Sequence, residues 1–375
     1  MKEITLFICI VLIISCTRDD QNKNPLEIAL SSQDPKIKRV MDNLEAHEVQ
    51  IRYTQIDRRN DSVIFTDYDF QVNDSLYFYP ASTAKFPTAV LALERLNRTD
   101  TLSMHTKYYV EGDSIESTVA EDITQIFAVS DNLANNRLVE LLGQDAINGN
   151  LRKKGIEPVR IAHRLGYHSD ELSTKPLIIY LNDSTTGITK PTINTSPKKL
   201  KLKGIQKGVG FYENDSIIQK PFDFGLKNYY PIATQHALLE RVIFPENFKE
   251  EERFDISDDQ REYLLNAMHT VPRKVGYDPI TFYDGYCKFY LYGDTKENIP
   301  ENIEIYNKVG FAYGTLTDCA YIKDTKNNID FMLTATILVN KDGIFNDDAY
   351  EYDEIGIPFL AQLGRELYQQ ELNRH

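Results

Sequence analysis

The sequence has no Trp, only four Cys among its 375 residues, and fewer positive than negative side chains. The absence of Trp excludes no function. No Cys-x-x-Cys pair or Cys/His spacing indicates a metal site, so we expect neither a metal nor another cofactor. The formal net charge of −14 argues against nucleic acid as a partner, because the chain would repel the phosphates. The apolar fraction of 42% suffices for a folded core.

The N-terminus has the pattern of an exported lipoprotein. Lys2 precedes a largely apolar run, residues 4–14, which is too short to span a bilayer and is typical of a signal peptide. Cys16 follows this run as the lipidated cysteine of a bacterial lipobox does, and a plain secretory signal with an incidental cysteine is the alternative. We therefore expect a signal peptide over 1–15, a lipid on Cys16 that holds the chain to the membrane, and a location in the bacterial cell envelope, facing the periplasm or the cell surface.

Residues 16–34 are mostly polar and predict a flexible tether, which leaves 35–375 for the folded domain. This domain contains two cysteines, Cys287 and Cys319. In an oxidising compartment they could form one disulfide, and two buried thiols are the alternative.

Strand-like segments lie at both ends of the domain, and helical segments lie between them. Strands are expected at 49–56, 63–72, 303–311, 318–323 and 329–339. Helices are expected at 35–46, 83–96, 123–142, 233–244, 257–268 and 356–372. The segment from about 172 to 230 breaks into short runs and is interpreted as an insertion. The predicted fold class is α/β in the broad sense (α+β), with one antiparallel sheet built from N- and C-terminal strands, flanking helices and a helical subdomain.

Ser82-Thr83-Ala84-Lys85 opens the first strongly helical segment. Residues three apart share a helix face, so Lys85 can reach the Ser82 hydroxyl. A lysine with a lowered pKa can take the serine proton and create a nucleophile. A helix N-cap is the alternative role for Ser82. The same spacing recurs at 196–199, where no helix should begin, and we dismiss that second match.

Two further motifs follow. Ser130-Asp131-Asn132 lies in a helical stretch, where such residues compete with helical hydrogen bonds. The start of a new helix is the alternative explanation. Lys308-Val309-Gly310 lies early in the predicted β-meander, and because Gly310 has no side chain, something could approach the backbone closely there. A plain strand lysine followed by a bulge glycine is the alternative there.

In this order the three motifs resemble the S-x-x-K, S-D-N and K-T-G signature of class A-like serine β-lactamases and penicillin-binding proteins. The resemblance covers roughly 35–375, with about 60 residues before 230 poorly matched. It implies an enzyme, namely a serine hydrolase that cleaves amide bonds through an acyl-enzyme. The expected reaction is β-lactam hydrolysis, on a small-molecule β-lactam or a peptide, by a monomer.

The resemblance implies four catalytic residues. Ser82 would attack the carbonyl carbon, and Lys85 would take its proton. Ser130 would pass a proton to the leaving nitrogen, and Lys308 would supply positive charge beside it.

Three residues would bind substrate. Asn132 would hydrogen-bond the side-chain amide of the substrate, and Gly310 would leave room for substrate beside the strand. The backbone N–H groups of Phe311 and Ser82 would form the oxyanion hole.

Two departures from the family pattern affect these expectations. Val309 replaces the usual Thr or Ser that binds the substrate carboxylate, and Thr315 or Tyr313 would have to supply that hydroxyl. The deacylating Glu of an E-x-x-L-N loop is missing from 164–172, where only Asp170 and Glu171 are candidates.

A literal E-x-x-L-N match at 262–266 lies too late in the chain, on a predicted amphipathic helix, and we dismiss it. Two alternatives to β-lactam hydrolysis therefore stay open. One is a D-alanyl peptidase or transpeptidase like the penicillin-binding proteins, or another acyl hydrolase. The other is a non-catalytic envelope lipoprotein of the same fold.

Overall fold

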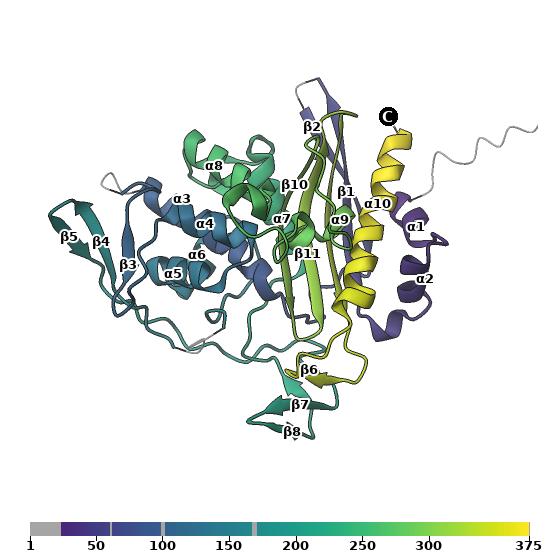
Figure 1. Ribbon diagram of the computed structural model, residues 1–375, viewed down its shortest axis with the longest axis horizontal. Coiled ribbons are helices and arrows are strands. Elements are labelled where there is room, and N and C mark those ends of the chain that lie inside the picture. Colours follow the sequence, from purple (N-terminus) through teal and green to yellow (C-terminus); the bar gives the residue numbers. More distant parts are fainter. Residues whose placement is uncertain (1–23, 61, 99–101, 167–170, 375) are drawn as a thin grey trace, which may run out of the picture.

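The computed structural model describes residues 24–60, 62–98, 102–166 and 171–374. A five-stranded antiparallel sheet, in the order β10-β11-β12-β1-β2, forms its centre (Figure 1). The strands are β1 (Gln50–Arg59), β2 (Ser62–Phe70), β10 (Ile303–Ala312), β11 (Thr315–Asp324) and β12 (Ile329–Leu338). Because β12 pairs with β1, the two ends of the chain meet in one sheet, which confirms the predicted fold class.

One face of the sheet is covered by helices from the two ends of the described chain (Figure 1). They are α1 (Pro25–Leu30), α2 (Pro35–Met41) and α10 (Ile357–Arg374). In α10, the buried residues Phe359, Leu363 and Leu367 follow one another at helical spacing and pack in the same apolar core as the strands.

The predicted tether over 16–34 needs a correction, because α1 lies inside it. Asn24 caps this helix and Pro25 occupies its first turn, a favoured position for proline. Leu26 and Ala29 are buried in the core beneath the sheet, so residues 25–30 belong to the domain. The apolar residues Leu26, Ala29 and Leu30 are few and lie next to a polar segment, so the sequence did not predict this helix. Cys16 and the lipobox lie outside the described residues.

The opposite face carries α7 (Ile232–Ile243) and the helical subdomain, which shares a second core with it. The subdomain consists of α3 (Lys85–Asn97), α4 (Val119–Ala128), α5 (Asn132–Leu142), α6 (Gln144–Lys153) and α8 (Asp258–His269). The predicted helix over 123–142 is therefore two helices. Short helical turns occupy Leu44–Ala46, Ala81–Ala84, Pro245–Asn247, Glu250–Glu252, Pro272–Val275, Asp284–Cys287, α9 (Phe289–Tyr292) and Tyr352–Gly356. None of the helices in the described ranges is long and apolar enough to cross a membrane.

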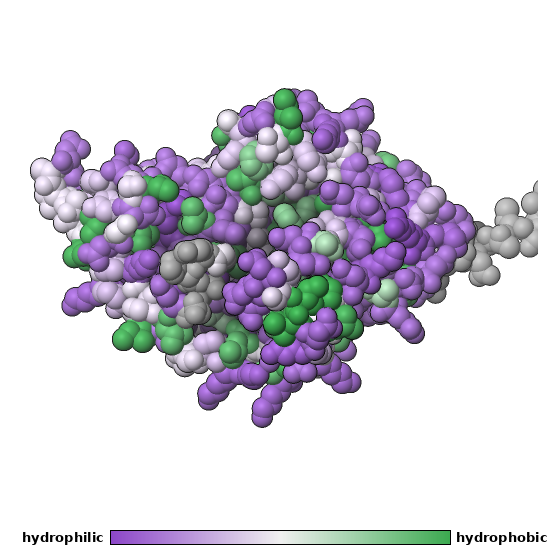
Figure 2. Space-filling model, turned by 60° about the horizontal axis from the view of Figure 1, so that its bottom comes forward, coloured by the Kyte–Doolittle hydropathy of each residue, from purple (hydrophilic) through white to green (hydrophobic). Residues whose placement is uncertain are grey.

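The segment from 172 to 230 forms short strands that attach to the rest of the chain. β4 (Leu177–Asn182) pairs with β3 (Tyr108–Val110) and β5 (Thr185–Ile188), and β6 (Gln206–Lys207) pairs with β9 (Phe222–Asp223). β7 (Gly210–Glu213) pairs with β8 (Ser216–Ile218) and with β13 (Ile344–Phe345). Figure 2, which turns this end of the molecule forward, shows a mostly hydrophilic face with hydrophobic side chains in a few patches. The pairing with β13 fixes the start of the loop that follows it.

Candidate active site

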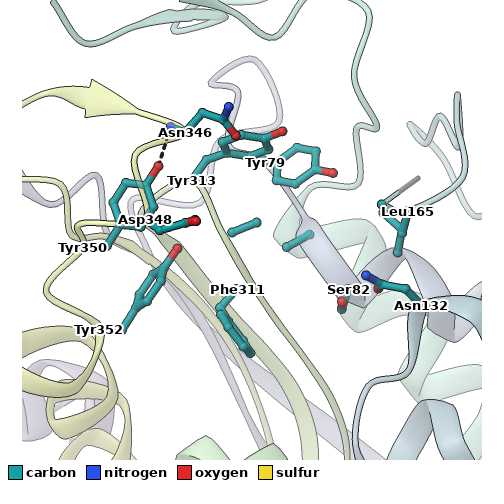
Figure 3. A pocket seen from close by; sticks show the side chains of 13 residues that line it. Tyr79, Ser82, Asn132, Leu165, Phe311, Tyr313, Asn346, Asp348, Tyr350 and Tyr352 are labelled. Atoms are coloured by element: carbon teal, nitrogen blue, oxygen red, sulfur yellow. Dashed lines mark hydrogen bonds between the residues drawn. The ribbon is translucent and has the colours of Figure 1, made fainter. Parts of the chain in front are cut away.

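A cavity of about 460 Å³ opens where the turn before α3 meets the free edge of β10. Its walls come from five separate parts of the chain (Figure 3). The lining residues are Tyr79, Ala81, Ser82, Asn132, Leu165, Gly166, Phe311, Ala312, Tyr313, Asn346, Asp348, Tyr350 and Tyr352. Of the residues predicted from the motifs, Ser82, Asn132 and Phe311 therefore line one cavity.

Ser82 occupies the helical turn Ala81–Ala84, directly before α3. Its side chain is half-buried, whereas its immediate neighbours are buried. The backbone N–H and hydroxyl of Thr83 both donate to the carbonyl of Pro80, which fixes the turn. The serine hydroxyl is thus presented to the cavity from a rigid segment.

Gly310 explains how this turn reaches the sheet edge. A Cβ at this position would lie 2.7 Å from the Pro80 oxygen and 2.8 Å from the Ser82 nitrogen. Only a residue without a side chain permits such an approach. The predicted close approach at Gly310 is confirmed, and the segment that approaches is the one that carries Ser82.

Lys85 and Lys308 both lie within hydrogen-bond distance of groups of Ser130. The Lys85 Nζ donates to the Ser130 carbonyl oxygen and lies 3.3 Å from Ser130 Oγ. The Lys308 Nζ donates to the same Oγ at 2.8 Å and to the Val309 carbonyl at 2.8 Å. One hydroxyl therefore lies between two amines that come from opposite ends of the chain.

Both lysines are buried, which changes their acidity. Burial, and then the neighbouring Lys308, lower the pKa of Lys85 well below its usual value. Burial also lowers the pKa of Lys308, to about 8, against the opposing influence of Cys287 and Asp318. A buried ammonium has lost its hydration, so the neutral amine is favoured. The lowered pKa of Lys85 favours its neutral amine, which can accept a proton, whereas Lys308 keeps its charge up to about pH 8.

Ser130 is held by the break between α4 and α5. Its φ is +59°, a left-handed conformation that is uncommon for a residue other than glycine. Asp131 caps α5 by accepting from the Ala134 N–H at 2.8 Å. The helix-cap explanation therefore applies to Asp131, whereas Asn132 lines the cavity and Ser130 contacts the two lysines.

A second polar network lies beneath β10. The buried Lys288 donates to Asn307 Oδ1 at 2.7 Å, and Asn307 Nδ2 donates to Asp318 Oδ1 at 2.8 Å. Burial raises the pKa of Asp318 to about 6. Asn307 directly precedes Lys308, so this network fixes β10 next to the residue that donates to Ser130. Cys287, next to Lys288, and Cys319 are both buried free thiols, so the disulfide alternative is wrong.

The wall beside Ser82 contains Leu165, which belongs to the segment 164–172 in which a deacylating carboxylate was expected. The Asn136 side chain forms two hydrogen bonds with the Leu165 backbone. It donates to the Leu165 carbonyl at 2.8 Å and accepts from the Leu165 N–H at 3.0 Å. Glu171 lines a different cavity, and Asp170 lies outside the described residues. Among the described lining residues, the one carboxylate is Asp348.

The dismissed motifs lie away from the cavity. The E-x-x-L-N match at 262–266 is part of α8, where Leu264 is fully buried. Residues 196–199 form no helix. Val309 is buried in the core of the sheet, and of its two proposed substitutes only Tyr313 lines the cavity, because Thr315 is buried elsewhere.

Four residues that line the far wall of the cavity were not predicted from the sequence. Asn346, Asp348, Tyr350 and Tyr352 follow β13 and lie more than 200 positions from Ser82 in the chain. They form no motif and no periodic pattern. The pairing of β13 with β7 and the contact of Tyr352 with the β10–β11 turn help to place them here.

One group of side chains has the composition of a metal site. Ligand atoms of Asp67, His236 and Glu240 lie within 4.8 Å of one another on the sheet face that α7 covers. Both His236 ring nitrogens already lie within hydrogen-bond distance of threonine hydroxyls, those of Thr54 and Thr334. The group is separate from the Ser82 cavity and is explained by structural hydrogen bonding.

Comparison with known proteins identifies the fold. A model of the β-lactamase enzyme family matches residues 34–201. The β-lactamase from Streptomyces albus G has a TM-score of 0.53 at 13% identity, over 92% of this chain and 99% of that one. A β-lactamase from Xanthomonas campestris pv. campestris has a TM-score of 0.52 at 16% identity, over 92% and 97%.

A third solved structure, of L2 complexed with relebactam, has a TM-score of 0.51 at 15% identity, over 92% of this chain and 98% of that one. No protein with a curated description matches the chain in sequence. At these identities the structures show the fold alone. Together with the family model they confirm the resemblance to the serine β-lactamase and penicillin-binding protein superfamily.

Proposed function

We propose that this chain, which has the serine β-lactamase fold, is a serine hydrolase that opens β-lactams through an acyl-enzyme on Ser82. One observation carries the proposal: Ser130 Oγ lies within hydrogen-bond distance of two buried amines, 3.3 Å from Lys85 and 2.8 Å from Lys308. Burying two amines beside one hydroxyl is costly for stability, and such sites are typically functional. A non-catalytic envelope lipoprotein would have no use for this arrangement.

Acylation begins with the neutral amine of Lys85. This amine takes the Ser82 proton, directly or through the Ser130 hydroxyl, as Ser82 Oγ forms a bond to the carbonyl carbon. The electron pair of the carbonyl moves onto its oxygen. The backbone N–H groups of Ser82 and Phe311 lie at the junction of the turn and the free edge of β10, where they would stabilise this oxyanion.

The leaving nitrogen departs toward Ser130. Its bond to the carbonyl carbon breaks, and it takes the proton of Ser130 Oγ, which Lys85 replaces with the proton it received. The positive charge of Lys308, 2.8 Å from Ser130 Oγ, favours release of that proton. Asn132, which lines the cavity together with Ser82, would hydrogen-bond the substrate amide.

Deacylation should be the slow step. Water needs a base to attack the acyl-enzyme, and among the described residues of the wall beside Ser82 the apolar Leu165 lies where a carboxylate would be needed. Lys85 is then the candidate base. The same observation favours a second function, a D-alanyl peptidase or transpeptidase like the penicillin-binding proteins, in which the long-lived acyl-enzyme is captured by an amine instead of water.

The test separates these functions. The purified domain is mixed with the chromogenic cephalosporin nitrocefin, and the acyl-enzyme is followed by intact mass spectrometry. A burst of one equivalent followed by slow steady turnover is expected for the hydrolase, and a burst without turnover for the second function. Ser82→Ala should abolish the burst, whereas Ser196→Ala, in the dismissed second match, should leave it unchanged. A burst that survives Ser82→Ala contradicts both functions.

We also propose that Cys16 is lipidated and holds the protein in the cell envelope. The support is the sequence alone, an apolar run of signal-peptide length that ends at this cysteine. Expression in a bacterium with an alkyne-labelled fatty acid should label the full-length chain in the membrane fraction. Cys16→Ala should abolish the label, and labelling that persists in this variant would overturn the proposal.

A further inference from the structure

The cavity has a second end, opposite Ser82, that is built from aromatic rings around one carboxylate. Figure 3 shows Asp348 among Tyr313, Tyr350 and Tyr352, with its side chain directed into the cavity, while Ser82 and Asn132 lie at the other end. The rings of Tyr350 and Tyr352 lie 5.3 Å apart between centroids. Ring faces and a carboxylate are the groups with which proteins bind cations, above all alkylammonium groups.

This end is held in place before any substrate binds. Tyr350 accepts from the Asn346 N–H at 2.7 Å, and Tyr352 accepts from the Gly314 N–H at 2.8 Å. The Asn346 side chain donates to the Tyr212 carbonyl at 2.9 Å, which ties the loop to β7. The phenol oxygens of Tyr350 and Tyr352 thus hold the loop that follows β13 in place, and the two rings face the cavity.

The charges of the side chains that line the cavity also favour a cation as its ligand. Asp348 is the one charged side chain among the described lining residues, and no described cation forms an ion pair with it. Lys308 is buried and directs its Nζ to Ser130 and to the Val309 carbonyl instead of into the open cavity. A cationic group of the substrate would therefore supply the positively charged partner of the Asp348 carboxylate.

We propose that the Asp348 end binds a positively charged group, an ammonium, on the acyl part of the substrate. The assignment to the acyl part follows from the order of residues along β10, and it rests on the proposed acylation of Ser82. The leaving group lies toward Ser130 and Lys308, whereas Phe311 and Ala312, the last residues of β10, lead in the other direction to Tyr313 in the turn before β11. Two residues span at most ~7 Å of chain, so about five methylenes suffice to connect the carbonyl at Ser82 to the aromatic end.

A matched pair of acyl donors tests this substrate class. The cationic probe is the p-nitrophenyl ester of 6-(trimethylammonio)hexanoic acid, and the neutral probe is the ester of 7,7-dimethyloctanoic acid. The two acyl chains have the same shape and differ only in the positive charge. The rate of the p-nitrophenol burst, measured at several ester concentrations, gives the second-order rate constant of acylation for each ester. We expect the cationic ester to acylate ~10-fold faster, from a solvent-exposed ion pair and cation–π contacts together.

Two variants with the same change in net charge supply the control. Asp348→Asn should reduce the cationic preference to ~2-fold or less, because the ring contacts remain and the ion pair is lost. Asp347→Asn removes a neighbouring carboxylate that does not line the cavity, and it should retain the full preference. Circular dichroism confirms that both variants fold.

Each outcome decides between the claims. Equal acylation by the two esters in the wild-type protein, or a preference that survives Asp348→Asn, overturns the cationic subsite. Absence of any Ser82-dependent burst with both esters overturns the proposed acylation itself. A preference lost in Asp348→Asn and kept in Asp347→Asn supports the subsite.

Discussion

Replacing Gly310 by Ala tests whether the close approach of the Ser82 turn to β10 is what creates the catalytic geometry. The added Cβ would lie 2.7 Å from the Pro80 oxygen, 2.8 Å from the Ser82 nitrogen and 2.9 Å from the Thr83 nitrogen. All three are backbone atoms, so no side chain can turn aside to relieve the contact. Ordinary contacts begin at 3.4 Å, and the turn must therefore move away from the strand by several tenths of an ångström.

The cost appears in both stability and rate. Overpacking of this kind costs ~1–3 kcal/mol of unfolding free energy. A displacement of about 1 Å in a catalytic group can cost ~100-fold in rate, and the smaller shift expected here should cost ~10-fold or more in acylation. Stopped-flow measurement of the nitrocefin burst and urea unfolding measure the two quantities.

Gly149→Ala is the matched control. This glycine lies within α6 with nothing within 4 Å of the added carbon. The same substitution should stabilise the protein by ~0.5–1 kcal/mol and leave the burst unchanged, because alanine favours the helix. If Gly310→Ala acylates at the wild-type rate with unchanged stability, the turn is not held against the strand in the way that the structure indicates.

Three further perturbations address the electrostatics and the wall of the site. The acylation rate should rise with pH as Lys85 loses its proton at its lowered pKa, and it should fall above about pH 8 as Lys308 loses its positive charge. A pH profile of the burst rate measures both changes, and a rate that still rises at pH 10 would contradict these roles. Leu165→Glu should speed decay of the acyl-enzyme by ~100-fold by placing a base beside Ser82, and equal decay in Leu165→Glu and Leu165→Gln would exclude that role. Asp122→Ala should lower the unfolding free energy by ~3–5 kcal/mol, because it leaves the buried Arg137 guanidinium unpaired, and urea unfolding with a loss below about 1 kcal/mol would refute that reasoning.

The sequence predicted residues that the structure brings together, Lys85 and Lys308 at Ser130, because much of the relevant signal is local. The spacing of Ser82 and Lys85 is a property of one helix turn, and the order of three short motifs supplied the rest. Alternation of apolar residues likewise predicted the strands that bring Lys308 to Ser130. These predictions needed only neighbours in the chain.

The far wall could not be predicted, because it depends on tertiary contacts. Asp348 and Tyr352 reach the cavity only because β13 pairs with β7 and because Tyr352 binds the Gly314 N–H at the β10–β11 turn. Helix α6 was missed for a different reason. Its sequence contains Gly149 and few apolar residues, and it is helical because Ile147 and Leu151 are buried on one face.

If Ser82 is the nucleophile, as proposed, the pairing of β12 with β1 has a consequence for when the site is complete. Ser82, Lys85 and Ser130 are synthesised early, but Lys308 reaches them only when β10, β11 and β12 have been completed and β12 has docked on β1. A chain that has just left the ribosome, or one cut before residue 303, contains the nucleophile without the charge that lowers the barrier beside it. The order of synthesis thus keeps the reactive serine idle until the last strands are in place.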